Sequence, residues 1–149
     1  MKRWLPLAGL LGLLPLAAVP ATAAQPDACR IVHPSEYQRV LHKRVKLSQG
    51  EGLTSCNVRV AGPQFPSIIP NVNPYNAAYV NRLLASLTGK QRVPGLGPKG
   101  YAVLIDGAPT VYAVRHGYII AFQSGADPGQ YHPTMAQMIA LTKIAYGRV

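Results

Sequence analysis

The segment YAVLIDGAPTVYAVRHGYIIAFQ, residues 101–123, sets the architecture of this chain. It contains three runs rich in β-branched and aromatic residues, at 101–105, 110–115 and 118–123. Asp106-Gly107 and His116-Gly117 separate these runs. Such pairs suit two-residue hairpin turns, because glycine adopts the positive φ that these turns require. We therefore predict an antiparallel meander of three strands.

Four segments outside the meander also show regular periodicity. Residues 55–61 alternate, with Cys56, Val58 and Val60 on one side, which predicts a further strand. Residues 34–45, 74–88 and 133–146 repeat apolar side chains at helical spacing, and each segment opens with proline. Asn73 and Gly89 suit the two ends of the second helix. The element order predicts an α+β domain whose helices cover an antiparallel sheet.

The N-terminal residues 1–24 have the features of a signal peptide. Lys2 and Arg3 precede an apolar run, and small residues close it at 21–24. We expect cleavage to leave one domain at residues 25–149, periplasmic or secreted and soluble, with no transmembrane segment. An uncleaved anchor is the alternative, but prolines and glycines interrupt the apolar run and no charged stop-transfer segment follows it.

Two cysteines, Cys29 and Cys56, remain after the leader. An even pair in a small exported domain predicts one disulfide. Metal binding by Cys29, His33 and Cys56 is the alternative, and the chain has no CxxC or HxxxH pairing to support it. Pro26-Asp27-Ala28 before Cys29 departs from a lipobox, so we do not expect a lipid anchor.

The charge of the chain is strongly basic. It carries 15 Lys and Arg against 5 Asp and Glu, and removal of Lys2 and Arg3 leaves 13 basic residues against the same 5 acidic ones. Such a surplus attracts anionic partners through long-range electrostatics. The candidate anion-binding surface is the outer face of the first predicted helix, formed by Arg39, Lys43, Arg44 and Lys46. A merely solvated helix surface is the alternative.

Catalytic and cofactor motifs do not fit their required contexts. Gly95-Leu-Gly-Pro-Lys-Gly100 is a literal GxGxxG, but a predicted helix precedes it and a strand follows, so we predict a loop and no nucleotide. His33 and His132 precede helix-opening prolines and are expected to cap helices or lie in turns, whereas His42 and His116 are expected on the surface. We predict no enzyme activity, no cofactor and no metal, and nucleic-acid binding is disfavoured because most tyrosines fall within the apolar core pattern.

Several short motifs resemble one family of small exported bacterial proteins of unknown function, many of them lipoproteins. Asp27-Ala28-Cys29 with Ile31-Val32-His33-Pro34-Ser35-Glu36 resembles its D-A-C-x-L-L-T-P-x-E opening, and Cys56 matches its second cysteine. Val93-Pro-Gly-Leu-Gly97 with Tyr101-Ala102-Val103 resembles V-x-G-L-G-D-x-A-Y, and Val114-Arg115-His116-Gly117 resembles V-R-K-G. Pro98-Lys99, His33 and the missing lipobox depart from it. The resemblance implies a PsbP-like α/β/α sandwich and no catalytic residues.

These observations together predict a non-catalytic binding or accessory protein. Its expected partner is an anionic envelope component or an acidic protein. A small secreted hydrolase acting on an anionic polymer is one alternative, which requires two histidines, or a histidine and an acid, within hydrogen-bond reach. An inhibitor or immunity-type protein is another. Three prolines disfavour regular structure in residues 62–73, so we predict a loop there, and in such a protein this loop would protrude.

Overall fold

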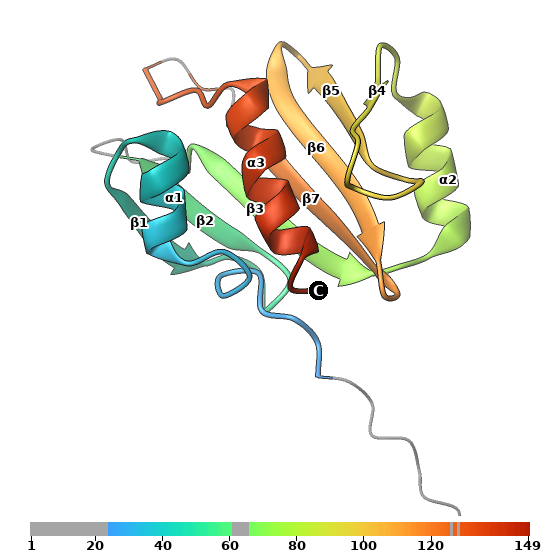
Figure 1. The fold of residues 1–149 in the computed structure, drawn as a ribbon, viewed down its shortest axis with the longest axis horizontal. Coiled ribbons are helices and arrows are strands. Elements are labelled where there is room, and N and C mark those ends of the chain that lie inside the picture. Colours follow the sequence, from blue (N-terminus) through green and yellow to red (C-terminus); the bar gives the residue numbers. More distant parts are fainter. Residues whose placement is uncertain (1–23, 61–65, 126, 128) are drawn as a thin grey trace, which may run out of the picture.

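A computed structural model describes residues 24–60, 66–125, 127 and 129–149. The expected signal peptide lies outside these residues, apart from Ala24. The described chain forms one antiparallel sheet of seven strands in the order β1-β2-β3-β7-β6-β5-β4 (Figure 1). The strands are β1 (Val45–Gln49), β2 (Cys56–Val60), β3 (Ile68–Pro74), β4 (Gln91–Arg92), β5 (Tyr101–Ile105), β6 (Ala108–Arg115) and β7 (Tyr118–Ser124).

Helices cover both faces of this sheet. The helices α1 (Pro34–Leu41) and α3 (Met135–Tyr146) pack on one face, where they enclose the larger core with side chains such as Val58, Phe122 and Leu141. The helix α2 (Ala77–Ser86) packs on the opposite face through Val80 and Leu84. The predicted α+β class, with an antiparallel sheet covered by helices, is therefore confirmed.

The predicted meander is present as β5, β6 and β7. Asp106 and Gly107 have φ values of 50° and 79°, and His116 and Gly117 have 46° and 82°. Positive φ at both central residues is the type I′ geometry, whose twist matches that of the flanking strands. The structure extends β6 two residues before the expected start, to Ala108. The hairpin signals alone thus locate both turns.

The sequence predicts a loop over residues 62–73, and this prediction is wrong where the structure describes the segment. Residues 61–65 lie outside the described residues, but Ile68–Pro74 forms β3, between β2 and β7. Pro70 lies within this interior strand, where its missing N–H normally breaks a ladder. The Val72 N–H donates to the Thr54 carbonyl at 2.8 Å, so even-numbered nitrogens of β3 point toward β2 and away from β7.

This parity explains how the sheet accommodates the prolines. Pro70 and Pro74 are both even-numbered, so their nitrogens face away from β7. Pairing with β7 is therefore unbroken from Ile68↔Ser124 to Pro74↔Tyr118. On the other side, the β2–β3 register retains Val58↔Ile68 and an isolated bridge at Ser55↔Asn71. The missing N–H of Pro70 therefore interrupts the β2–β3 seam and leaves the β3–β7 ladder intact.

Each predicted helix extends beyond the observed helix at one or both ends. The first is expected over residues 34–45, but it ends at Leu41 because His42 adopts a left-handed conformation with φ 54°, and Val45 already begins β1. The second starts three residues later than expected: Asn76, not Asn73, caps α2 by accepting the Tyr79 N–H at 3.0 Å. The third begins at Met135, after the N-cap Thr134, and Pro133 precedes it.

The predicted disulfide is present. Cys29 and Cys56 are joined with their Cα atoms 5.0 Å apart, and the bond ties the turn before α1 to the first residue of β2. Nearby, the Ala28 N–H donates to the Leu53 carbonyl at 2.9 Å. The segment before α1 is thus fixed to the β1–β2 hairpin by one covalent and one hydrogen bond.

A bidentate ion pair connects α1 to the chain after α3. The Arg148 guanidinium donates to both Glu36 carboxylate oxygens at 2.7 Å and to the Ile31 carbonyl at 2.9 Å. The hydrogen bonds from Arg148 hold the pKa of Glu36 below its ordinary value, against the opposing effect of burial. Glu36 also accepts the His33 N–H at 2.9 Å, so one carboxylate closes the start of α1 and anchors Arg148.

Removal of the disulfide is expected to destabilise the domain. The double variant Cys29→Ala/Cys56→Ala should unfold with a free energy lower by about 2–4 kcal/mol, because the unfolded chain regains the entropy of a closed loop. Urea unfolding followed by far-UV circular dichroism measures this difference. Equal midpoints for the variant and the oxidised parent would contradict the structural role assigned to this bond.

The Glu36–Arg148 pair is expected to make stability depend on pH. Its carboxylate has a lower pKa in the folded than in the unfolded chain, so its contribution is complete at neutral pH and is lost as the pH falls below the ordinary value of 4.5. Glu36→Gln should lower Tm by up to about 4 °C at pH 7. The difference from the parent should shrink in acid. Glu51→Gln is the control, since this exposed carboxylate is in neither described ion pair, and an unchanged Tm for Glu36→Gln would contradict the prediction.

Candidate functional site

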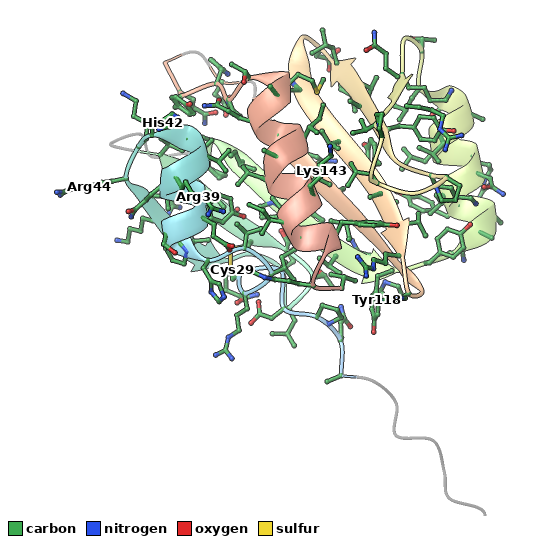
Figure 2. All side chains as sticks on the ribbon, viewed as in Figure 1. Cys29, Arg39, His42, Arg44, Tyr118 and Lys143 are labelled. Atoms are coloured by element: carbon green, nitrogen blue, oxygen red, sulfur yellow. A yellow bond between two sulfur atoms is a disulfide. The ribbon has the colours of Figure 1, made fainter. Side chains whose placement is uncertain are left out.

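The four predicted anion-binding residues do not share one helix face. Arg39 lies on α1, Lys43 and Arg44 lie in the connection after it, and Lys46 lies on β1. The left-handed turn at His42 causes this difference, because it redirects the chain into the outer strand of the sheet. Figure 2 shows Arg44 extending outward from this edge, with His42 at the end of α1. We call Arg39, Lys43, Arg44 and Lys46 the basic edge.

The basic edge is exposed, and no described ion pair neutralises it. All four side chains are solvent-exposed. The two salt bridges within the described ranges join Arg30 to Asp27 and Arg148 to Glu36, and neither involves the basic edge. Lys46 lies opposite Arg59 in the β1–β2 register, so a fifth cation adjoins the edge. Like charges at this spacing produce a positive local potential.

The four histidines come from separate parts of the fold: His33 at the N-cap of α1, His42 at its C-cap, His116 in the β6–β7 turn and His132 before α3. His33 occupies the N-cap position of α1, as predicted, whereas His132 does not cap α3, whose N-cap is Thr134, and lies in the irregular connection before it. His42 and His116 are exposed, as predicted. Across the described ranges, no group of three His, Cys, Asp or Glu side chains is arranged to hold a metal ion.

The GxGxxG string lies in the connection between β4 and β5, as a loop. Leu96 in this loop is buried in the main core. Gly100 approaches it so closely that an added Cβ would overlap the Leu96 Cβ and lie 2.7 Å from the Leu96 carbonyl oxygen. A Cβ on Gly97 would lie 2.6 Å from the Tyr146 hydroxyl of α3. The glycines therefore permit close packing of the loop on the core, and no helix start follows them.

A polar groove that the sequence did not reveal lies on the α2 face of the sheet. It has a volume of about 550 Å³ and is lined by Asn71, Asn73, Pro74, Tyr79, Leu83, Tyr112, Ile119, Ala121 and Gln123. Asn71 of β3 pairs with Ala121 of β7, which pairs in turn with Tyr112 of β6. A methyl group thus stands between two larger side chains in one row across the sheet. This row creates the hollow, and α2 forms one side of it.

The groove contains two tyrosines in different settings. Burial raises the pKa of Tyr112, against the opposing effect of a hydrogen bond with Gln123. Tyr79 on α2 is 55% exposed, which is high for a large aromatic side chain. Tyr112 is therefore buried beside the floor of the groove, and Tyr79 remains accessible at its side.

A second hollow, of about 470 Å³, lies at the β4–β5 edge. Its lining combines Met135 and Ile139 of α3 with Ala102 and Leu104 of β5. Leu104 is 61% exposed. This hollow is mainly apolar, although Thr88, Gln91 and Arg92 also line it, whereas amide side chains line the groove on the α2 face.

Comparison with protein-family models, with curated proteins and with solved structures gives no significant match for this chain. No helix in the described ranges has the length and apolar character needed to cross a membrane. The geometry of the described residues is therefore the basis for the functional proposals below.

A larger side chain at one glycine of the β4–β5 loop is expected to destabilise the domain. Gly100→Ala should lower the free energy of unfolding by about 1–3 kcal/mol, because its Cβ meets backbone as well as the Leu96 side chain. Gly147→Ala is the control, since there the nearest atom lies at 3.4 Å, an ordinary contact. Chemical unfolding of both variants measures the difference. Equal stability of the two would contradict the close packing described for Gly100.

Proposed function

We propose that this chain is an exported, non-catalytic binding protein whose basic edge contacts phosphate groups of the cell envelope. The observation that carries the proposal is the exposure of Arg39, Lys43, Arg44 and Lys46 on adjoining elements, within eight residues of sequence. No acidic residue lies between positions 39 and 46. Clustered Lys and Arg side chains bind phosphate well, through charge-assisted hydrogen bonds.

Export to the periplasm or the medium is part of the same proposal. The leader-like residues 1–24 support it. The Cys29–Cys56 disulfide supports it independently, because such bonds persist in oxidising compartments. Pro26-Asp27-Ala28 favours a released protein over one acylated at Cys29, whose sulfur is already paired with Cys56.

We further propose that the domain is a PsbP-like α/β/α sandwich. Support comes from the arrangement of α1 and α3 on one face of the sheet and α2 on the other. The short motifs that resemble the family of small exported proteins include residues that form turns or pack in the core. Gly97 packs against α3, and the pair His116-Gly117 forms a hairpin turn. These positions support a shared architecture and carry no catalytic role.

Binding is favoured over the hydrolase alternative by the placement of the titratable groups. Hydrolysis by general acid and base needs two such groups near one substrate bond. His116 contacts the Val149 backbone oxygen at 2.8 Å, and His132 contacts the Gly125 carbonyl at 3.2 Å. The Glu36 carboxylate, which accepts the His33 N–H at 2.9 Å, also accepts two hydrogen bonds from Arg148. Asp106 and His132 line one hollow of about 240 Å³, but within the described residues no hydrogen bond joins their side chains. These contacts are structural, whereas the basic edge is open to solvent.

Charge reversal on the basic edge is expected to weaken phosphate-dependent binding strongly. Arg39→Glu/Lys43→Glu should reduce sedimentation with phosphatidylglycerol vesicles or with lipopolysaccharide at least tenfold at low salt. Binding by the parent should weaken steeply as NaCl is raised, because exposed charges are screened. The two probes share phosphate groups, and comparison between them identifies which source is bound better.

The matched control reverses the same number of charges at the other end of the sheet. Arg82→Glu/Arg92→Glu alters exposed residues on α2 and β4, with an equal change in net charge. We expect this variant to retain most of the binding. If both double variants lose binding equally, net charge and not the basic edge is responsible. If the basic-edge variant binds like the parent with an unchanged salt dependence, the proposed contact surface is wrong.

A further inference from the structure

The polar groove beside α2 presents hydrogen-bonding groups without charge. Its polar side chains are the amides of Asn71, Asn73 and Gln123 and the hydroxyls of Tyr79 and Tyr112. No Lys, Arg, Asp or Glu is among its lining residues. We call these five polar residues the amide groove. A charged ligand would find no counter-charge in it, so its ligand should be neutral and polar.

Two of these groups are free to bind a ligand. Among the described residues, the Asn73 amide and the Tyr79 hydroxyl have no hydrogen-bond partner within the protein. Asn71 donates to the Ile69 carbonyl of its own strand at 3.2 Å, which leaves its amide oxygen available. A side-chain amide offers both donors and an acceptor, and a phenol offers one of each. The groove can therefore satisfy a ligand that carries donors and acceptors close together.

The apolar parts of the groove have a definite arrangement. The methyl group of Ala121 and the side chain of Ile119 form its floor, and Leu83 and Tyr79 of α2 form one side. Adjacent strands are about 4.8 Å apart, so Asn71 and Tyr112 stand about 10 Å from each other across Ala121. This width accepts a ring that places one face on apolar atoms and its edges toward the amides.

We propose that the amide groove binds an uncharged oligosaccharide that carries acetamido groups. A pyranose ring has C–H groups that pack on an aromatic face, and the exposed ring of Tyr79 offers such a face. Ring hydroxyls pair with side-chain amides. An acetamido group has one N–H and one carbonyl, which match the acceptor and donors of Asn73 or Asn71 as a two-point contact.

The location of the groove favours a sugar over a peptide. An extended peptide binds a sheet by adding a strand at an edge, through backbone hydrogen bonds. The amide groove lies on the face of the interior strands β3, β7 and β6, whose backbone groups are engaged with one another. It offers side chains only, and these suit a ligand whose hydrogen-bonding groups project from a ring. The proposal is also independent of the basic edge.

Titration with a defined sugar tests the proposal. We expect (N-acetylglucosamine)₄ to shift the amide resonances of residues 71–73, 79–83 and 119–123 in ¹⁵N-labelled protein. Maltotetraose, which has hydroxyls but no acetamido groups, should bind at least about tenfold more weakly. Tyr79→Ala and Asn73→Ala should each weaken binding of (N-acetylglucosamine)₄ by about tenfold or more. Both residues are exposed, so the variants should keep the Tm of the parent.

Matched controls separate binding in the groove from nonspecific effects of substitution. Leu53→Ala removes an apolar side chain that is 50% exposed, and Gln38→Ala removes an exposed amide on α1. Neither should change sugar binding, and nor should Arg39→Glu/Lys43→Glu. Loss of phosphate binding in that double variant with sugar binding intact would distinguish the two proposals. Shifts elsewhere, no shifts at all, or shifts at the groove with tetra-alanine in place of the sugar would overturn the amide groove as a saccharide site.

Discussion

The pairing of β7 with both β3 and β6 constrains every other part of this molecule. β7 is apolar on both faces, with Ile120 and Phe122 in the larger core and Ile119 and Ala121 in the smaller one. A strand of this kind must be covered on both sides, which places α3 on one face and α2 on the other. It also joins the N-terminal strands β1–β3 to the meander. The amide groove is a direct product, because its floor is the α2 face of β7.

Local signals predicted the elements whose formation is local. Two turn pairs at Asp106-Gly107 and His116-Gly117 locate the meander without any knowledge of tertiary contacts. β3 was not predictable in this way, because Pro70 argues against a strand unless the partner on each side is known. β1 cannot be predicted locally for a different reason: the helical spacing of residues 34–45 continues past His42, and the helix ends at the left-handed φ of that residue.

The two candidate surfaces also differ in whether their residues lie close together in the sequence. The residues of the basic edge lie within one stretch of eight positions, so the sequence predicts its members even though the predicted helix boundary is wrong. The amide groove combines Asn71, Tyr79, Tyr112 and Gln123 from three strands and a helix. Their proximity follows from the register of β3, β7 and β6, which the sequence of any one segment does not contain. Asparagine and glutamine in these segments had no distinguishing local signal.

The proline-interrupted seam between β2 and β3 has a consequence for how the domain opens. Because few backbone bonds cross this seam, we expect the β1–β2 hairpin and α1 to separate from the remaining sheet at a lower free energy than global unfolding. Two contacts between α1 and the C-terminal part of the chain oppose this opening. Gln137 of α3 donates to the Val40 carbonyl at 3.2 Å, and Arg148 forms an ion pair with Glu36. Amide protons of β2 should therefore exchange with solvent through subglobal openings, whereas those shared by β3 and β7 report the whole fold. The contacts of α1 with α3 and with the chain after α3 therefore stabilise the sheet at its weakest seam.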